Sequence, residues 1–351
     1  MNRPPVETTR RQVLRAGALL AVGALPLSAC GSADRTGSST TSGAKGLTTV
    51  TLALDYLPGA AHNGLAYAMQ EGLFAKQGIK VEIIPYGSTV AETLVSAGKA
   101  DLGISSEYGT AITALAAGAP MKAIFMLTPH QPFRLAVLAS SGITSPAQLG
   151  GHTYGGFGAA IESVIVDAMI KGAGGHGEIR QVVLSTGSYE ALQGKRVDCT
   201  FVYPDEAFQF DREGVKLTEF SNADYGVPDD TGNLVIANTA WLTADPALAR
   251  GFLKAMRQGY QVAIDNPAAA NRALLKQFPG VDQALVDYVA KYQAKELFPN
   301  PDGPIGTLSV EKWKKYAAWL SANSLLVDAG GKQLHSFDPS PYVTNSYLPD
   351  S

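Results

Sequence analysis

The stretch TVTLALDYLPGAAHNGLAYAMQEGLFAKQGIKVEIIPY, residues 49–86, decides the fold that the sequence predicts. Its two ends, residues 49–56 and 81–86, are rich in β-forming residues. Between them, apolar residues recur at helical spacing and stop at Gly78. A strand, a helix and a second strand in this order are typical of a parallel α/β unit.

The same alternation continues along the chain, and helix-length segments are expected between the strands. Further β-rich runs lie at residues 101–105, 122–128, 134–139, 152–157, 181–185, 197–203, 216–220 and 233–238. Helical patterns lie at residues 159–171 and 189–193, and then, with amphipathic spacing, at 247–265, 267–278, 281–296 and 310–322. The sequence therefore predicts α/β architecture with parallel sheets.

Residues 47–351 exceed the length that one hydrophobic core usually serves, so we expect two lobes. The simplest arrangement inserts the second lobe into the first. Residues 47–136 and 236–351, the latter mostly helical, would form the first lobe, and residues 137–235 the second. Strands near residues 134–140 and 233–238 would cross between them. A ligand would bind in the cleft between the lobes, beyond the carboxyl ends of the strands.

The N-terminal region predicts export and anchoring. Arg10 and Arg11 begin a twin-arginine motif, a short apolar run follows, and the tetrapeptide Leu-Ser-Ala-Cys that ends at Cys30 resembles a bacterial lipobox. We expect residues 1–29 to be a signal peptide and Cys30 to become a lipidated N-terminus on the outer face of the cytoplasmic membrane. The alternative is an ordinary secretory signal with a chance cysteine. Residues 30–46, rich in Ser, Thr and Gly, would be a flexible tether.

Composition excludes several classes of function. A net charge of -3 and a charged fraction of 17% leave no broad basic surface for nucleic acid. Apart from Cys30 the chain contains one cysteine, Cys199, which predicts a buried structural thiol and no intramolecular disulfide. The five histidines lack metal-ligand spacing, and no catalytic signature motif is present. We expect a monomer without metal, cofactor or catalytic residues.

Candidate ligand-binding residues of the first lobe follow its predicted strands. They are Asp55, Tyr56, His62, Ser88, Ser105 and Glu107. An aromatic face suits a planar heterocycle, which favours Tyr56 as a ligand contact. Asp55 has the alternative role of a helix cap or hinge contact, His62 that of a surface or helix-turn residue, and the two serines that of helix caps.

The second lobe contributes two further loops. Residues 155–158 read Gly-Gly-Phe-Gly between a strand and a helix, so that Gly156 and Phe157 could offer backbone N–H groups to an anion or a polar ligand atom, or simply form a tight turn. Tyr203, Asp205 and Glu206 could stack on a flat ring and accept hydrogen bonds from an exocyclic amine. The two carboxylates have the alternative role of stabilising a helix N-terminus. Tyr225 could close over the cleft.

Several phrases together resemble the substrate-binding proteins of ABC importers, and within them the NMT1/THI5-like group of pyrimidine thiamine-precursor binders. These phrases are residues 54–58 with His62, residues 64–68, 71–74, 78–81, 141–143, 149–155 and 225–229. The resemblance implies a two-lobed type II periplasmic-binding-protein fold that closes on a ligand and delivers it to a permease. It also implies contact of Tyr203, Asp205 and Glu206 with an aminopyrimidine. Pro204 and Phe208 stand where a tryptophan-bearing version is expected.

Three functions follow in order of preference. The first is a binder of an aminopyrimidine thiamine precursor, of the hydroxymethylpyrimidine or formylaminopyrimidine type. The second is a binder of an aliphatic sulfonate, nitrate or a riboflavin-like ligand; a sulfonate would favour the helix start at residues 155–158 and Arg134. The third is an enzyme such as hydroxymethylpyrimidine phosphate synthase. The resemblance disfavours it, because residues 105–109 lack the lysine and histidine of that enzyme and no cysteine cluster exists.

Overall fold

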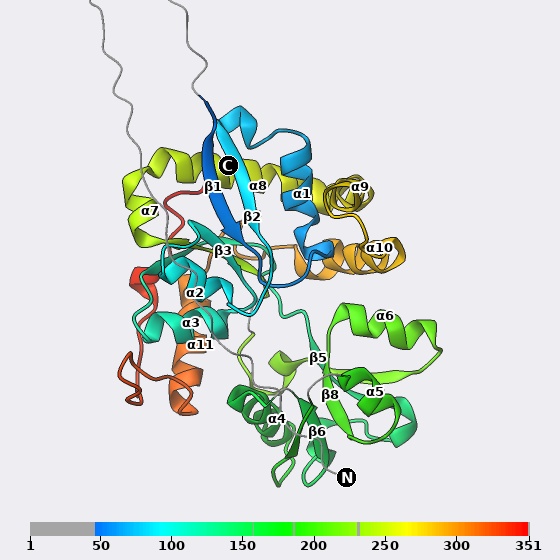
Figure 1. The fold of residues 1–351 in the computed structure, drawn as a ribbon. Coiled ribbons are helices and arrows are strands. Elements are labelled where there is room, and N and C mark those ends of the chain that lie inside the picture. The colour runs from blue at the N-terminus through cyan, green and yellow to red at the C-terminus, as the bar shows by residue number, and fades with distance from the viewer. Residues whose placement is uncertain (1–45, 157, 185–186, 230–231, 350–351) are drawn as a thin grey trace, which may run out of the picture. The chain divides into compact units, whose positions relative to one another are not determined.

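The protein is described by a computed structural model over residues 46–156, 158–184, 187–229 and 232–349. Each of the ten predicted strands is present, and they form two five-stranded sheets (Figure 1). The first sheet contains β1 (Thr48–Ala53), β2 (Ile79–Ile84), β3 (Leu102–Ser105), β4 (Met121–Met126) and β10 (Leu234–Asn238). The second contains β5 (Arg134–Leu138), β6 (Thr153–Gly156), β7 (Arg180–Val183), β8 (Cys199–Val202) and β9 (Leu217–Phe220). The expected two-lobed α/β fold is confirmed.

The two sheets share one plan. Their strand orders are β2-β1-β3-β10-β4 and β7-β6-β8-β5-β9. In each, three parallel strands come first, and the fourth place is taken by an antiparallel strand, β10 or β5. The parallel arrangement that the sequence predicts therefore fails at β10 and β5, the strands expected to cross between the lobes. Each antiparallel strand enters from the segment that connects the two sheets, so it runs opposite to the βαβ strands beside it.

The first connection between the sheets also differs from expectation. Residues 127–133 join β4 to β5, and they contain no helix. The chain thus passes directly from β4, at the edge of the first sheet, to β5, the fourth strand of the second sheet. The second connection returns the chain from β9 to β10 through the 3₁₀ turn Asn222–Tyr225. Strands β5 to β9 thus interrupt the first sheet in chain order.

Eleven α-helices surround the sheets over the described residues. They are α1 (Asn63–Gln70), α2 (Ala91–Ser96), α3 (Tyr108–Ala116), α4 (Ala160–Gly172), α5 (Ser188–Gln193), α6 (Pro204–Arg212), α7 (Thr239–Ala244), α8 (Pro246–Asp265), α9 (Pro267–Gln277), α10 (Gln283–Tyr292) and α11 (Val310–Ala322). Asp245 caps α8 by accepting from Leu248 N at 2.9 Å, and Asn266 caps α9 in the same way. A proline at the first position follows each cap, because its missing N–H costs nothing there.

Two glycines bring α1 against α8. A Cβ added at Gly259 would lie 2.9 Å from the Ala68 Cβ and would collide with the Gly64 carbonyl oxygen. A Cβ at Gly64 would lie 2.6 Å from the ring of Tyr260. The hydroxyl of Tyr260 then reaches across and donates to Ala61 O at 2.7 Å. This close crossing fixes the loop that leaves β1 toward α1.

A threonine and an aspartate connect two strands in each sheet. In the first sheet the N–H and hydroxyl of Thr51 donate to Asp101 Oδ2, both at 2.8 Å, and Asp101 N donates back to Thr51 Oγ1 at 2.9 Å. In the second sheet Thr153 and Asp198 repeat all three hydrogen bonds, at 2.7, 2.7 and 3.1 Å. Burial raises the pKa of Asp198, but the hydrogen bonds from Thr153 and the nearby His152 outweigh burial and leave it below its ordinary value.

The predicted structural cysteine lies in the core of the second lobe. Cys199 is fully buried, and burial raises the pKa of its thiol, as expected of a structural cysteine. Among the described residues, no helix combines the length and hydropathy that a membrane span requires. Arg10, Arg11, Cys30 and Phe157 lie outside the described residues.

Candidate functional site

Asp55 lies just after β1 and is held by two partners from the chain itself. His62 Nε2 donates to Asp55 Oδ1 at 2.9 Å, and Asn233 Nδ2 donates to Asp55 Oδ2 at 2.5 Å. Gly59 N donates to His62 Nδ1 at 3.2 Å, so the imidazole is neutral with its proton on Nε2. Because Asn233 immediately precedes β10, Asp55 connects the β1 loop to the return connection between the sheets, and His62 supports it from behind with 2% exposure.

Tyr56 is the exposed neighbour of this buried aspartate. It is 57% exposed, and its ring centroid lies 5.1 Å from that of Tyr86, which follows β2. Burial raises the pKa of Tyr56, and Asp205 is the next cause, followed by Tyr86 and Glu206. Since Asp205 begins α6 after the second sheet, Tyr56 brings an aromatic face from the first sheet to the carboxylates of the second.

Tyr203, Asp205 and Glu206 form the start of α6. Pro204 occupies the first position of the helix, and Tyr203 N donates to Glu206 Oε2 at 2.9 Å in a capping box. Glu206 therefore takes the helix-stabilising role that the sequence allowed for it. Asp205 accepts no hydrogen bond from any described residue, and its charge acts on the phenols of Tyr56 and Tyr203.

Tyr203 lies near carboxylates that follow strands of both sheets. Its ring packs 5.2 Å from that of Phe133, while 41% of the residue remains exposed. Burial of the phenol, then Glu107, Glu206, Asp205 and Glu162, hold the pKa of Tyr203 well above its ordinary value. We call Tyr56, Glu107, Glu162, Tyr203, Asp205 and Glu206 the tyrosine–carboxylate cluster.

Glu107 brings a carboxylate to this cluster from the first sheet. It precedes α3, and Thr110 Oγ1 donates to its Oε1 at 3.4 Å. Burial, together with the charges of Glu92 and Glu162, raises the pKa of Glu107 to about 7 against the hydrogen bond from Thr110. A carboxyl group with this pKa exists in both protonation states near neutrality, so it can donate or accept a hydrogen bond.

Glu162 occupies the helix start that the sequence offered to an anion. Its Oε2 accepts from Gly158 N at 2.9 Å, from Ala159 N at 3.0 Å and from Gln181 Nε2 at 3.2 Å. Its Oε1 accepts from the Tyr154 hydroxyl at 3.3 Å. Gly156 ends β6 directly beneath it, and an added Cβ would lie 2.8 Å from Glu162 Oε2. The N–H groups of Gly158 and Ala159 are thus satisfied by a carboxylate of the protein itself.

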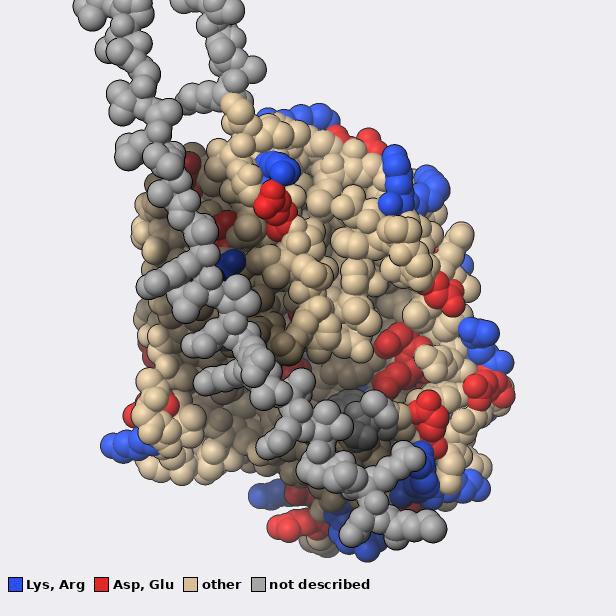
Figure 2. All heavy atoms as spheres, in the orientation of Figure 1, with Lys and Arg blue, Asp and Glu red and all other residues tan. Residues whose placement is uncertain are grey.

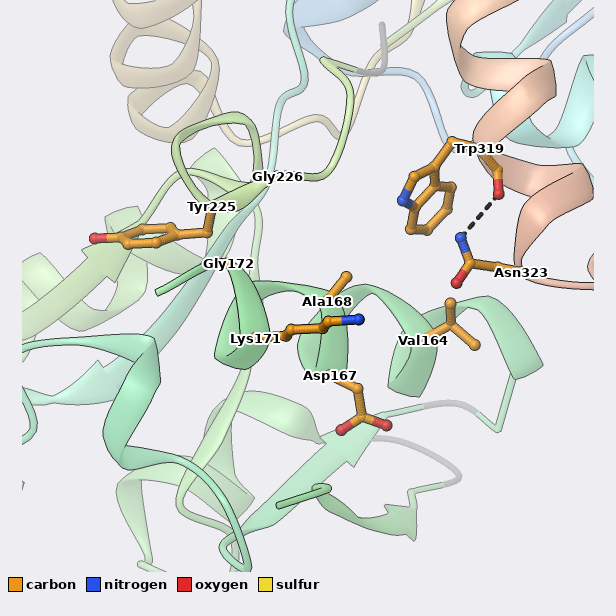
Figure 3. A pocket seen from close by; sticks show the side chains of 9 residues that line it. All are labelled: Val164, Asp167, Ala168, Lys171, Gly172, Tyr225, Gly226, Trp319 and Asn323. Carbon is orange, nitrogen blue, oxygen red and sulfur yellow. Dashed lines mark hydrogen bonds between the residues drawn. The ribbon is translucent and has the colours of Figure 1, made fainter. Parts of the chain in front are cut away.

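Other predicted residues lie outside the cluster. Ser88 is exposed after β2. Ser105 is fully buried and donates to Glu92 Oε1, so it belongs to the interior of the first sheet. Tyr225 lines a different space, a hollow of about 640 Å³ between α4 and α11 that also includes Trp319 and Lys171. Figure 3 shows the Tyr225 ring directed away from Trp319.

The structure adds residues that the sequence analysis did not select. Glu162, Tyr154 and Tyr86 join or border the cluster. The signal for Glu162 was available, since a glutamate three residues after the cap position Ala159 has capping-box spacing. The sequence gave no signal for Tyr154, because this residue lies inside strand β6. Its hydroxyl joins the site by donating to Glu162, which follows in the next helix.

The cluster offers flat aromatic surface and many hydrogen-bond acceptors. The groups that shift the pKa of Tyr56, Tyr203 and Glu107 include no cation among the described residues. Within the described part of the chain, no three His, Cys, Asp or Glu side chains are placed to hold a metal ion. On the face drawn in Figure 2, the basic side chains are scattered and do not gather into one patch. Such a site suits a planar ligand that donates hydrogen bonds.

This fold, with polar loops at the strand ends of two sheets, is that of two-lobed substrate-binding proteins. The alkanesulfonate-binding protein SsuA from Xanthomonas axonopodis pv. citri bound to MOPS is similar, with a TM-score of 0.64 over 86% of this chain and 99% of that chain. The two sequences are 16% identical, so this likeness concerns the fold.

The family model described as NMT1/THI5 like matches residues 60–270, and the chain belongs to this family. The formylaminopyrimidine-binding protein of Halalkalibacterium halodurans is 28% identical over 297 residues, which cover 82% of this chain and 89% of that protein. The 4-amino-5-hydroxymethyl-2-methylpyrimidine phosphate synthase of Legionella pneumophila is 24% identical over 319 residues, which cover 86% of this chain and 93% of the synthase.

Proposed function

We propose that the protein is the solute-binding component of an ABC importer and that it binds an aminopyrimidine precursor of thiamine, of the hydroxymethylpyrimidine or formylaminopyrimidine type. The observation that carries this proposal is the placement of Asp205 beside two tyrosines in a cluster of acceptors. An aminopyrimidine supplies a flat ring for the tyrosines and an amine that donates to a carboxylate. The family and its formylaminopyrimidine-binding relative support the same ligand class.

A sulfonate fits this arrangement poorly. The N–H groups of Gly158 and Ala159 already donate to Glu162. Arg134, the cation that a sulfonate would use, donates through Nη1 to the carbonyl oxygens of Gln131 and Phe133. An anion in the cluster would therefore lie close to several carboxylates, and no described lysine or arginine is among the groups that shift the pKa of Tyr56, Tyr203 or Glu107.

The wider role follows from the sequence signals and the family. In our proposal the chain is exported by the twin-arginine route, is lipidated at Cys30, and holds its two lobes outside the membrane as a monomer. It captures its ligand between the lobes, with boundaries near residues 136 and 235, and releases it to a permease. Its work is preferential binding to the closed state, with no bond made or broken.

Thermal melting of the full chain tests the ligand. The panel contains hydroxymethylpyrimidine, formylaminopyrimidine, thiamine, riboflavin, taurine and nitrate. A ligand at a hundred times its dissociation constant stabilises the protein by ~2.7 kcal/mol, which appears as a clear increase in melting temperature. We expect this increase with a pyrimidine, and an absence of any increase with both pyrimidines would contradict the proposal.

Substitution of Asp205 tests the site. Asp205→Asn removes the charge that receives the amine, and we expect the pyrimidine to bind about tenfold or more weakly, because a hydrogen bond to a charged group contributes about 1.5–3 kcal/mol. Asp265→Asn, an exposed change on α8, is the matched control and leaves the dissociation constant unchanged. Equal affinities of the two variants, measured by calorimetry, would place the ligand elsewhere.

A further inference from the structure

We propose that Glu107 and Glu162 act together as a charge selector: they bring two carboxylates together from the two lobes, so the lobes close only around a ligand that places hydrogen-bond donors or positive charge between them. This inference rests on the proposed function and adds the reason for its selectivity. It also assigns a ligand-discriminating role to Glu162, which the sequence analysis did not select.

The two glutamates come together because the helices that follow them meet. Glu107 precedes α3, and Glu162 lies in the first turn of α4. A Cβ added at Gly109 in α3 would lie 3.6 Å from Ile161 Cδ1 in α4. Ile161 packs against buried residues of both lobes. The starts of α3 and α4 are therefore in contact across the two lobes, and the charge of Glu162 is among the causes that raise the pKa of Glu107.

The groups that face this pair add negative charge. Glu92 approaches Glu107 from α2, where Ser105 donates to it. Tyr203, Asp205 and Glu206 approach from the connection between β8 and α6. Tyr154 donates to Glu162 from β6, and Thr110 donates to Glu107 from α3. No described lysine or arginine is among the groups that shift the pKa of Glu107 or the pKa of Tyr203.

Closure without a suitable ligand therefore brings like charges together. At low dielectric this repulsion is strong, and it is relieved by protonation or by a donor placed between the carboxylates. The raised pKa of Glu107 has burial as its first cause and the charges of Glu92 and Glu162 as the next. A sulfonate or nitrate would add a further negative charge, whereas an aminopyrimidine supplies donors at its amine and, when protonated, at its ring nitrogen.

The test compares Glu107→Gln and Glu162→Gln with Glu71→Gln, an exposed change on the first lobe that serves as control. Small-angle scattering of the ligand-free full chain gives its radius of gyration at about pH 5 and about pH 8. We expect the wild type and the control to be more expanded at the higher pH, and the two site variants to be compact at both. Circular dichroism verifies that each variant is folded.

Calorimetry with 4-amino-5-hydroxymethyl-2-methylpyrimidine and with methanesulfonate measures selectivity in the same proteins. We expect each site variant to bind the pyrimidine about tenfold more weakly, and the wild type to bind no methanesulfonate. The selector would be overturned if the wild type binds the pyrimidine and both variants have the same pyrimidine affinity and the same radius of gyration as the wild type. Failure of the wild type to bind any pyrimidine would instead contradict the proposed function, and the scattering result would still decide whether the two carboxylates oppose closure.

Discussion

Glu162 and Glu206 occupy the same position in the two helices that begin at the site. Each is the third residue of its helix, and each accepts from the backbone N–H of its cap residue, Ala159 at 3.0 Å and Tyr203 at 2.9 Å. A carboxylate in this place stabilises the helix through its free N–H groups and its dipole. It also occupies the N–H of the cap residue, which is then not available to an anionic ligand. One residue type thus serves both folding and selectivity.

Glu107 gives a pH dependence of stability with a definite sign. Its pKa is raised in the folded protein, to about 7 from an ordinary value of 4.5, first by burial. The folded state then binds more protons than the unfolded state between these values, so the free energy of unfolding falls as pH rises through this range. We expect Glu107→Gln to remove part of this decline, by up to about 1.4 kcal/mol per pH unit.

Urea denaturation of the wild type and Glu107→Gln at several pH values checks this expectation. Glu71→Gln again serves as the control, because Glu71 is exposed. The difference in unfolding free energy between Glu107→Gln and the wild type should grow as the pH rises from about 4.5 to about 7. A difference that stays constant across this range would contradict the raised pKa of Glu107.

Sequence alone located the loops of the site but not the partners within them. Tyr56, Glu107 and Tyr203 follow strands β1, β3 and β8, and strand ends are readily predicted from β-rich runs. The side chain that each one meets is set by contacts between distant segments, as Asn233 meets Asp55 across the return connection. A single sequence holds no record of such contacts, so a carboxylate free for a ligand and one bound to an asparagine look alike in it.

At the level of elements, a threonine and an aspartate connect two neighbouring parallel strands in each lobe. Asp101 precedes β3 and Asp198 precedes β8, and each connects its strand to the neighbouring parallel strand. We expect Thr51→Val to destabilise the protein by about 1–3 kcal/mol, because it removes the hydroxyl that accepts from the Asp101 N–H and donates to the Asp101 carboxylate, which keeps only the Thr51 N–H. Thr49→Val, on the exposed part of β1, is the matched control and should have little effect. Equal denaturation midpoints for the two variants would exclude a stabilising role.

At the α1–α8 crossing we expect a glycine-to-alanine substitution to destabilise the protein, which is the opposite of what helix propensity predicts. Alanine normally favours a helix interior over glycine by about 1 kcal/mol. At Gly259 the added methyl would collide with Gly64 O, so we expect Gly259→Ala to destabilise the protein by about 1–3 kcal/mol. Gly87→Ala, where the added Cβ meets nothing within 4 Å, is the control. If Gly259→Ala melts at a higher temperature than the wild type, α1 and α8 can move apart without loss of stability, and the expectation is wrong.

Elements were easier to predict than their directions. The amphipathic runs at residues 247–265 and 267–278 placed α8 and α9 within one residue of their observed starts. The direction of β5 and β10 has no local signal, because a strand in the fourth place of a mixed sheet has the same β-rich pattern as a parallel neighbour. The helix expected between β4 and β5 was wrong for a related reason, since a chain that changes sheets needs no crossover helix.

At the scale of the whole molecule, α6 and α10 form a second contact between the lobes. The Phe208 and Tyr288 ring centroids lie 4.9 Å apart, and the Tyr288 hydroxyl donates to Asp211 Oδ2 at 3.3 Å. The guanidinium of Arg212 lies 5.6 Å from the Phe208 ring centre. Because Tyr203 is the cap residue of α6, this contact couples the position of the site to the position of α10.

Phe208→Ala should therefore favour separated lobes. An aromatic pair contributes about 0.5–1.5 kcal/mol beyond area burial, so we expect pyrimidine affinity to fall by about 2–12-fold and the ligand-free radius of gyration to increase. Phe337→Ala removes an aromatic pair with Tyr342 at 5.8 Å, remote in sequence from α6 and α10, and is the control. Calorimetry and small-angle scattering measure both effects, and identical results for the two variants would exclude a role of α6 in closure.

The place of β10 in the first sheet governs the order in which this protein can fold during synthesis. Strand β4 pairs only with β10 among the described strands, and β10 also covers the open edge of β3. Both edges stay unpaired until the ribosome has made the whole second lobe and reached Asn238. The nascent chain thus carries an incomplete first sheet for more than half of its translation, and a fragment ending before β10 exposes strand edges that invite aggregation.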